Sequence, residues 1–95
     1  MVSLNDKTVL ITGASSGLGR ALALQLAKEK CNLVLSARRL ERLKEVEDEA
    51  KKINPDLKSL IVKTDISEEK DVMNLFEKVI KKFGKVDVLI NNAGR

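Results

Sequence analysis

Three glycines and two serines form the part of this sequence best suited to binding a ligand. Gly13, Gly17 and Gly19 stand in the stretch TGASSGLG, which also holds Ser15 and Ser16. Glycine lets a chain turn tightly and lets backbone N–H groups approach a bound group closely. At the start of a helix such N–H groups bind anions, phosphates above all. The stretch therefore predicts a loop that binds the pyrophosphate of a dinucleotide.

The glycine spacing distinguishes this loop from two common phosphate loops. It is Gly-x3-Gly-x-Gly, whereas the commonest dinucleotide fingerprint is Gly-x-Gly-x2-Gly. No lysine follows Gly17 or Gly19, which argues against the phosphate loop of nucleoside triphosphatases. The alternative is that the glycines serve a tight turn alone. Their place between a strand-like segment and a helix-like segment weakens that alternative.

A second cluster of small and polar residues comes at the end of the chain. Asn91, Asn92, Ala93 and Gly94 follow an apolar segment. Asn and Gly are ordinary turn residues, so this cluster alone is equally typical of a surface turn. It points to a binding site only if the fold places it opposite the glycine loop.

The composition excludes several other kinds of chemistry. The 95 residues include no His and one Cys, so no His–Cys zinc set, His-based triad or internal disulfide can form. The net charge of +4 comes from Lys and Arg interleaved with Glu and Asp, which indicates solvated helix faces rather than a nucleic-acid surface. Phe76 and Phe83 share one apolar helix stripe, which favours core packing over base stacking.

The sequence also carries a prediction of location. The first residues lack the basic and apolar segments of a secretory signal, and no apolar run approaches the roughly 18 residues that span a bilayer. The single Cys31 is typical of a reducing compartment. We expect a cytoplasmic protein that binds neither membranes nor nucleic acids.

Hydrophobic periodicity alternates along the chain between strand-like and helix-like segments. Short apolar runs predict four strands, and amphipathic or Ala- and Leu-rich segments predict three helices between them. The last helix is expected to be capped by Ser67 and ended by Gly84. In chain order we expect a strand at 7–12, a helix at 17–30, a strand at 32–37, a helix at 40–53, a strand at 59–64, a helix at 68–83 and a strand at 86–91.

This βαβαβαβ order predicts an α/β fold, because nearly continuous apolar strands are typical of a parallel sheet covered on both faces. Right-handed crossovers place the first two helices on one face. If the chain then crosses back, the third helix covers the other face and the strand order is 3-2-1-4. The glycine loop and the Asn cluster then lie side by side, where the strand order reverses.

With both motifs in place, the chain resembles the N-terminal half of the short-chain dehydrogenase/reductase family. Thr12–Gly19 matches TGxxxGxG, Asn91–Gly94 matches NNAG, and Asp65 and Ile66 follow the third strand. The resemblance covers essentially the whole chain. It implies a Rossmann-type sheet that is incomplete relative to the full family fold, with residues 1–95 forming the N-terminal part of a single NADP(H)-binding domain.

The resemblance also assigns residues to parts of the dinucleotide. The glycine loop would line the diphosphate and ribose, and Asp65 and Ile66 would lie at the adenine. Asn92, Ala93 and Gly94 would contact the adenosine ribose side and support the sheet, whereas Thr12 and Asn91 would be structural. For Asp65 the alternative is a solvated turn carboxylate before a helix. The expected cofactor-binding residues are Gly13, Ser15, Ser16, Gly17, Leu18, Gly19, Arg38, Arg39, Asp65, Ile66, Asn92, Ala93 and Gly94.

The end of the second strand indicates which dinucleotide is preferred. Sheets that bind NAD place an Asp or Glu about 20 residues beyond the glycine turn, where it accepts the ribose hydroxyls and repels a 2′-phosphate. Ala37 occupies that position here, and Arg38 and Arg39 follow it. A guanidinium pairs with a phosphate through two hydrogen bonds. We therefore expect NADP(H) to be preferred over NAD(H), with Arg38 as the principal ligand.

Two observations bear on that preference. NADP-dependent members of the family often carry a second basic residue just before the middle glycine, where this chain has Ser16. The alternative role for Arg38 and Arg39 is that of solvated residues at a helix start, although a cation there opposes the helix dipole.

The resemblance assigns no catalytic residue to this chain. In the family, hydride transfer between the nicotinamide and a carbonyl or alcohol relies on a Ser, a Tyr-x3-Lys pair and a further Asn, all beyond the NNAG motif. The chain contains no Tyr, and no Ser or Lys follows Asn91. Because Tyr is the family's proton donor or acceptor, we expect these residues alone to be inactive.

Three hypotheses follow. The preferred one is the cofactor-binding segment of an NADP(H)-dependent oxidoreductase acting on a carbonyl or secondary alcohol, with the small-molecule substrate bound only in the full-length parent. The second is a non-catalytic module that binds or senses NADP(H). The third is a fragment that self-associates without binding cofactor. A downstream Tyr-x3-Lys in the coding sequence would support the first, a stop codon would support the second, and an NADPH titration tests the third.

The last strand also predicts self-association. Residues 86–91 have the apolar content of a strand buried on both faces, yet the order 3-2-1-4 places them at an edge of the sheet. An unpaired edge invites pairing with another copy of the chain. We expect a dimer or larger assembly through this strand.

Overall fold

Seven elements alternate along the chain in the computed structural model, which describes residues 3–92. They are β1 (Thr8–Thr12), α1 (Gly17–Leu26), β2 (Asn32–Ala37), α2 (Leu40–Ile53), β3 (Lys58–Lys63), α3 (Glu69–Phe83) and β4 (Val88–Asn91). The order βαβαβαβ and the type of every element agree with the prediction from hydrophobic periodicity. No helix in the described part is long and apolar enough to cross a membrane.

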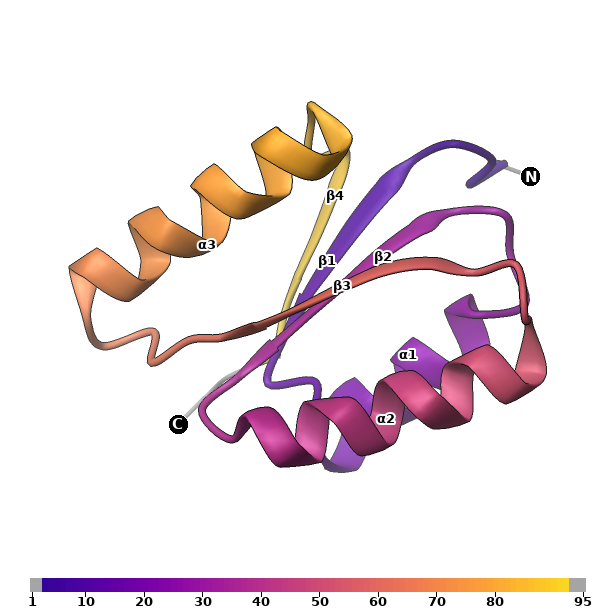
Figure 1. Ribbon diagram of the computed structural model, residues 1–95, viewed down its shortest axis with the longest axis horizontal. Coiled ribbons are helices and arrows are strands. Elements are labelled where there is room, and N and C mark those ends of the chain that lie inside the picture. Colours follow the sequence, from indigo (N-terminus) through magenta and orange to yellow (C-terminus); the bar gives the residue numbers. More distant parts are fainter. Residues whose placement is uncertain (1–2, 93–95) are drawn as a thin grey trace.

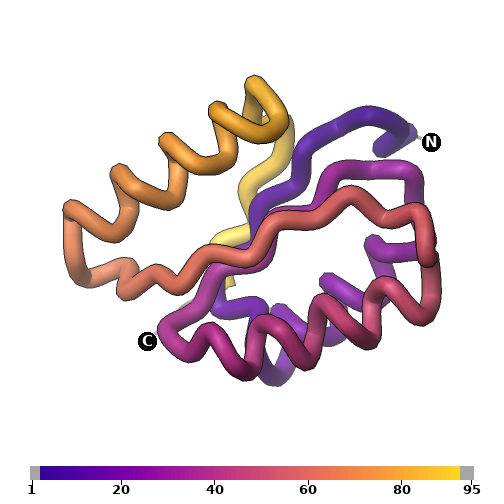
Figure 2. The backbone as a smooth tube through the Cα atoms, in the orientation of Figure 1, coloured from indigo at the N-terminus to yellow at the C-terminus, as the bar shows by residue number. Residues whose placement is uncertain are grey.

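The four strands form one parallel sheet in the order β3-β2-β1-β4, as predicted. In this register the last residue of β1, Thr12, lies beside Ser36 of β2 and Asn91 of β4. The helices α1 and α2 cover one face, and α3 covers the other (Figure 1; Figure 2). The order of the strands reverses between β1 and β4, so their carboxyl ends flank the crevice where ligands bind in sheets of this kind.

Strand β1 lies at the centre of the core. Its five residues are all buried, and because successive side chains point to opposite faces, the strand serves both hydrophobic clusters. Val9 and Ile11 belong to the larger cluster, with α1 and α2, whereas Leu10 belongs to the smaller one, with Leu75 and Val79 of α3. Because its core neighbours hold β1 from both faces, the loop that follows it starts from a well-defined point.

The first helix is shorter than predicted. It ends at Leu26 rather than at Lys30, since the N–H groups of Lys28 and Glu29 donate to the carbonyl oxygens three residues before them. These tight turns bring the chain round to β2. The favourable helix propensity of residues 27–30 does not prevail, because the chain must reverse there to enter the sheet beside β1.

The start of α3 also differs from the prediction. Ser67 does not cap the helix, which begins at Glu69 with Glu68 at the N-cap position. The N–H and the hydroxyl of Ser67 instead donate to Asp65 Oδ1, at 2.9 and 2.6 Å. Short polar side chains compete for local hydrogen bonds in this way, and here the turn after β3 takes precedence over the helix end. The predicted stop at Gly84 is confirmed, with φ of 80°.

Strand β4 begins at Val88 rather than at residue 86, because Asp87 bonds to β1 with its side chain as well as its backbone. Its N–H donates to the Thr8 carbonyl at 2.9 Å, and its carboxylate accepts the Thr8 N–H at 2.8 Å. The hydrogen bond from Thr8 lowers the pKa of the Asp87 carboxyl below its usual value, and Lys85, 3.3 Å away, lowers it further.

We expect Asp87→Asn to lower the urea midpoint of unfolding at neutral pH. A carboxyl whose pKa is depressed in the folded state stabilises the fold above its unfolded pKa, and this stabilisation is lost as the pH falls through the folded value. The difference between the two proteins should therefore shrink as the pH falls from about 5 to about 2. Asp56→Asn, at an exposed carboxylate, is the control. A difference that stays constant with pH would contradict this role of the charge.

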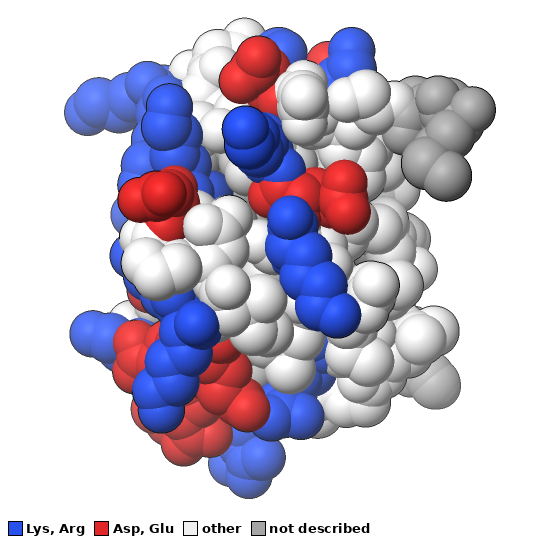
Figure 3. Space-filling model, turned by 90° about the vertical axis from the view of Figure 1, so that its right-hand side faces the viewer, with Lys and Arg blue, Asp and Glu red and all other residues white. Residues whose placement is uncertain are grey.

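Charges of both signs cover the surface. On the face shown in Figure 3, Lys and Arg side chains lie next to Asp and Glu side chains, which gather most closely at the lower left. This mixture agrees with the interleaved charges of the sequence. A cluster of three arginines, Arg38, Arg39 and Arg42, lies at the carboxyl ends of the strands.

Candidate functional site

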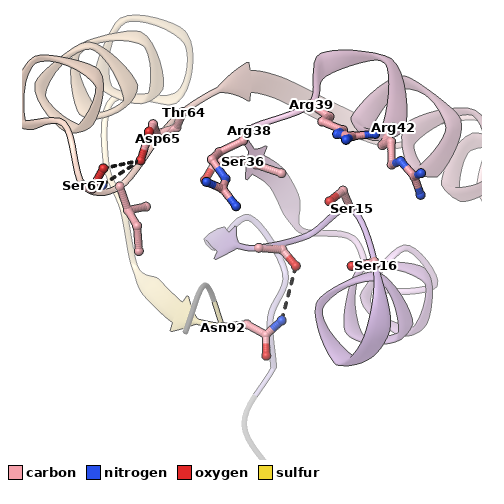
Figure 4. A pocket seen from close by; sticks show the side chains of 13 residues that line it. Ser15, Ser16, Ser36, Arg38, Arg39, Arg42, Thr64, Asp65, Ser67 and Asn92 are labelled. Carbon is pink, nitrogen blue, oxygen red and sulfur yellow. Dashed lines mark hydrogen bonds between the residues drawn. The ribbon is translucent and has the colours of Figure 1, made fainter. Parts of the chain in front are cut away.

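A pocket of about 900 Å³ opens at the carboxyl ends of the strands. Its walls come from the glycine loop after β1, the end of β2 with the start of α2, the turn after β3, and the end of β4 (Figure 4). Most of its lining side chains are polar or cationic. The lining residues are Gly13, Ser15, Ser16, Ser36, Ala37, Arg38, Arg39, Arg42, Thr64, Asp65, Ile66, Ser67 and Asn92.

The glycine loop turns through two left-handed backbone positions. Gly13 has φ of 63° and Gly17 has φ of 58°, which glycine adopts without strain. The N–H of Ala14 donates to the Ser36 carbonyl at 3.1 Å and ties the loop to β2. Ser16 holds the N-cap position of α1 in an extended conformation, and its side chain does not cap the helix. The first N–H groups of α1 are therefore suited to hold an anion.

Gly19 lets α1 approach the loop and β4 closely. A Cβ atom at this position would overlap the carbonyl oxygen of Gly13 and lie 2.7 Å from Asn92 Nδ2. The Asn92 side chain itself donates to that same carbonyl oxygen at 3.2 Å. The requirement for glycine at 19 is thus one of packing, and it keeps the helix N-terminus next to the pocket.

Thr12 and the two asparagines join the ends of β1 and β4. The Thr12 hydroxyl donates to Asn91 Oδ1 at 2.9 Å, and the Asn92 N–H donates to Thr12 Oγ1 at 3.0 Å. This chain of hydrogen bonds holds the glycine loop and the start of the NNAG motif side by side, as the strand order predicted. Ala93 and Gly94, two of the expected binding residues, lie outside the described residues.

Three arginines lie together at the start of α2. Arg38 follows β2, Arg39 is the N-cap residue, and Arg42 is in the first turn of the helix. Figure 4 shows Arg38 extending into the middle of the pocket, with Arg39 and Arg42 on the wall nearer Ser15. Within residues 3–92, no Asp or Glu carboxylate forms an ion pair with any of the three; the pairs found there are Arg20–Glu49 and Lys85–Asp87.

Asp65 lies across the pocket from the arginines, where Figure 4 shows it paired with Ser67. The hydrogen bonds from the Ser67 hydroxyl and N–H lower the pKa of the Asp65 carboxyl, and the charge of Arg38 lowers it slightly further. Ile66, 45% exposed, provides an apolar surface beside it. An exposed apolar side chain next to a hydrogen-bond acceptor is suited to an aromatic base with an amino group.

Among the buried side-chain nitrogen and oxygen atoms in the described part of the chain, the Ser36 hydroxyl oxygen alone has no hydrogen-bond partner. Ser36 is 1% exposed and lines the pocket. A buried hydroxyl without a partner costs free energy, which a polar ligand or a water molecule in the pocket would offset.

The pocket contains some of the sequence-predicted residues and not others. Gly17, Leu18 and Gly19 do not line it, although their backbones begin the helix at its edge; the Leu18 side chain is 65% exposed. Arg42 was not among the site residues predicted from the sequence. Its spacing of three and four residues from Arg39 and Arg38 would have placed it on their side of the helix. The other lining residues that it missed are Ser36, Thr64 and Ser67.

The side chains that line the pocket can bind a ligand through hydrogen bonds and opposite charge. They offer hydroxyls, an amide, guanidinium groups and one carboxylate whose pKa is lowered. The backbone N–H groups, the three cations and the hydroxyls together suit an extended, polyanionic and polar ligand.

Comparison with known proteins gives a consistent result. A family model described as short chain dehydrogenase matches residues 7–95. An uncharacterised oxidoreductase of Listeria monocytogenes is 40% identical over 93 residues, which are 98% of this chain and 37% of the relative. This chain therefore spans about a third of the length of such relatives.

Two solved structures match the fold closely. An NAD⁺-bound xylitol dehydrogenase superposes with a TM-score of 0.90 at 32% identity, covering 99% of this chain and 35% of that protein. The L-sorbose reductase of Gluconobacter frateurii, complexed with NADPH and L-sorbose, superposes with a TM-score of 0.91 at 38% identity, covering 98% of this chain and 35% of that protein. Structures of this type are thus similar to the chain whether they hold NAD⁺ or NADPH.

Proposed function

The chain belongs to the short chain dehydrogenase family, and we propose that it forms the NADP(H)-binding part of an oxidoreductase acting on a carbonyl or secondary alcohol. The observation that carries the proposal is the pocket wall at the end of β2. It holds Ala37 in place of a carboxylate, followed by arginines that have no ion-pair partner among residues 3–92.

The glycine loop and the first turn of α1 would hold the diphosphate. Gly13 and Gly17 supply the turn, and the uncapped N–H groups of α1 face a negative charge favourably. Asp65 and Ile66 would hold the adenine, and Asn92 would support the adenosine ribose side. Ala93 and Gly94 remain predicted contacts. When bound, the dinucleotide supplies the hydride that the family exchanges with its substrates.

NADP(H) fits the end of β2 better than NAD(H) does. The Ala37 side chain offers the ribose hydroxyls no acceptor, and its site carries no negative charge to repel a phosphate. Arg38 and Arg39 can each pair with a phosphate through two parallel N–H bonds. The L-sorbose reductase complex with NADPH is consistent with this preference, whereas the NAD⁺-bound xylitol dehydrogenase shows that the fold alone does not decide it.

We expect the 95-residue chain alone not to catalyse hydride transfer. It contains no Tyr, which is the proton donor or acceptor in the family. Its role would then be binding, with the substrate held by other parts of a longer protein. A cytoplasmic location is part of the proposal, because Cys31 is a free, buried thiol.

Calorimetric titration of the chain with NADPH and with NADH tests the proposal. We expect saturable binding of both, with NADPH bound more tightly. Equal affinities would overturn the NADP(H) preference, and the absence of binding to either would overturn the cofactor-binding role and favour a fragment that only self-associates.

We also propose that the chain self-associates along β4. This strand is at the edge of the sheet, its Leu89 is 53% exposed, and one side of its backbone lacks a neighbouring strand among the described residues. An exposed edge of this kind pairs readily with another strand. Another copy is the partner available to the 95-residue chain in solution.

Light scattering should therefore give a dimer or larger species at tens of micromolar protein, and Leu89→Lys should shift it toward the monomer. Ile53→Lys, which alters an apolar residue 44% exposed at the end of α2, is the matched control. A monomeric parent chain would contradict the proposal.

A further inference from the structure

Strand β3 forms the other edge of the sheet. In the order β3-β2-β1-β4 it has one neighbouring strand, β2, among the described residues. Successive residues of a parallel strand direct their N–H and C=O groups alternately to one side and to the other. Thr64, directly after β3, donates its N–H to the Ala37 carbonyl at 2.8 Å, so the residues two and four positions before it also face β2. The N–H and C=O groups of Ser59, Ile61 and Lys63 therefore point away from the sheet.

The composition of β3 favours pairing with another strand. Its sequence is KSLIVK, in which Leu60, Ile61 and Val62 are consecutive apolar residues. Short apolar segments of high β propensity without proline or glycine are typical of strands that pair with copies of themselves. Lys58 and Lys63, both exposed, stand at the two ends of the strand. Charged residues that flank an apolar strand hinder such pairing at its ends, which leaves the backbone between them to be protected.

Lys82 of α3 occupies the outward carbonyl oxygen of Ser59. Its Nζ donates to that oxygen at 2.7 Å and lies 5.6 Å from the centroid of the Phe83 ring, whose face attracts a cation. The Ser59 hydroxyl donates to Glu47 Oε2 of α2 at 2.6 Å. Because α2 and α3 lie on opposite faces of the sheet, Ser59 is held from both sides (Figure 1). A side chain from each helix therefore fixes this point of the edge.

Pairing with another β3 requires the acceptor that Lys82 occupies. An antiparallel partner centred on Ile61 places Lys63 of a second copy opposite Ser59, and its N–H must donate to the Ser59 carbonyl. Lys82 would have to withdraw from that oxygen first. The pairing would also bring Lys58 and Lys63 of both copies to one edge, where like charges on neighbouring strands destabilise the contact.

We propose that Lys82 holds the β3 edge closed to a second copy of the chain. This role goes beyond the proposed function, and it rests on the self-association through β4 only where it concerns the size of the assembly. Strand β4 carries no charged residue, so it remains the edge at which two copies can pair. A two-fold contact at β4 alone gives a closed dimer, whereas two-fold contacts at both edges extend the sheet from copy to copy. Lys82 therefore limits the assembly to a dimer.

Removing Lys82 from a chain that does not pair through β4 isolates its effect. Leu89→Lys is expected to be monomeric at tens of micromolar protein. Adding Lys82→Ala to it frees the Ser59 carbonyl, and we expect light scattering to give at least about twice the monomer mass. Lys82→Ala alone leaves both edges open, so this variant should grow beyond the dimer.

Two variants control for the loss of charge and for the loss of the contact. Lys81→Ala removes a lysine from the neighbouring exposed position, and Lys82→Arg keeps a cationic donor at the same position. Both should keep the mass of the chain into which they are introduced. Hydrogen exchange locates the new contact, because the amides of Ile61 and Lys63 should gain protection after Lys82→Ala and not after Lys81→Ala. Protected amides in β1 show that each variant is folded.

The outcomes separate this role from the proposed pairing through β4. An unchanged mass after Lys82→Ala, with and without Leu89→Lys, would overturn the role of Lys82. Growth in which Ile61 and Lys63 gain no protection would also overturn it, because the copies would then meet elsewhere. A monomeric parent chain would overturn the pairing through β4, and growth of the Leu89→Lys chain after Lys82→Ala would still support the closed edge at β3.

Discussion

Replacing Arg38 with alanine is expected to weaken NADPH binding by about 10- to 100-fold and to leave NADH binding within about threefold of its original value. Arg38 extends into the middle of the pocket, directly after β2, where Ala37 leaves the ribose without a carboxylate (Figure 4). A hydrogen bond between charged groups stabilises a complex more than one between neutral groups. NADH has no phosphate at this position, so the substitution removes no such bond from its complex. Calorimetric titration of both ligands measures the two effects in the same protein.

The matched control is Lys51→Ala, which removes one charge from the last turn of the same helix, far from the pocket. It should leave both affinities nearly unchanged. If Arg38→Ala weakens NADPH and NADH equally, Arg38 binds the shared diphosphate or adenine rather than the 2′-phosphate. The assignment of NADP(H) would then lose its main support.

Gly19→Ala is expected to destabilise the chain by about 3 kcal/mol and to abolish measurable dinucleotide binding. The added methyl group would overlap the carbonyl oxygen of Gly13 and approach Asn92 Nδ2, which is hydrogen-bonded to that oxygen. The Gly13 oxygen belongs to the backbone and cannot move aside as a side chain can, so α1 must move away from the loop. Moving the helix also moves its N-terminus out of reach of the diphosphate. Urea unfolding and NADPH titration measure the two effects.

Gly17→Ala is the informative comparison. A Cβ atom at Gly17 meets nothing within 4 Å, but φ of 58° strains any other residue, at a cost of about 1–2 kcal/mol. We therefore expect a smaller loss of stability than for Gly19→Ala. Equal losses in the two variants, or a smaller loss for Gly19→Ala, would contradict the close packing inferred at position 19.

The fold could be predicted from sequence because its determinants are local and repeated. Apolar runs separated by amphipathic segments specify strands and helices, and the right-handed crossover then restricts the strand order. The predicted strand at 32–37 and helix at 40–53 agree with β2 and α2. The first helix was predicted too long, since its end depends on where the chain must turn back into the sheet and not on the propensity of residues 27–30.

The site was predictable only where a motif marks it. Gly13, Ser15, Ser16 and Asn92 line the pocket, and their contacts with a dinucleotide remain predictions. Ser36 could not be identified, because a serine in an apolar strand carries no sign that its hydroxyl will lack a partner. Ser67 was predicted to cap the N-terminus of the last helix. Its N–H and hydroxyl instead donate to the Asp65 carboxylate in the turn after β3. Such choices depend on hydrogen bonds that sequence spacing does not reveal.

We propose that one pocket, between the glycine loop and the start of α2, binds NADPH through its diphosphate and its 2′-phosphate. The measurement that tests it most directly is a ¹H–¹⁵N NMR titration of the labelled chain with NADPH. We expect the largest shifts at the backbone amides of residues 13–19, 36–42 and 65–67, with the 36–42 shifts reduced when NADH replaces NADPH. Shifts that are absent from these segments, or that are the same for the two ligands at residues 36–42, would contradict the account.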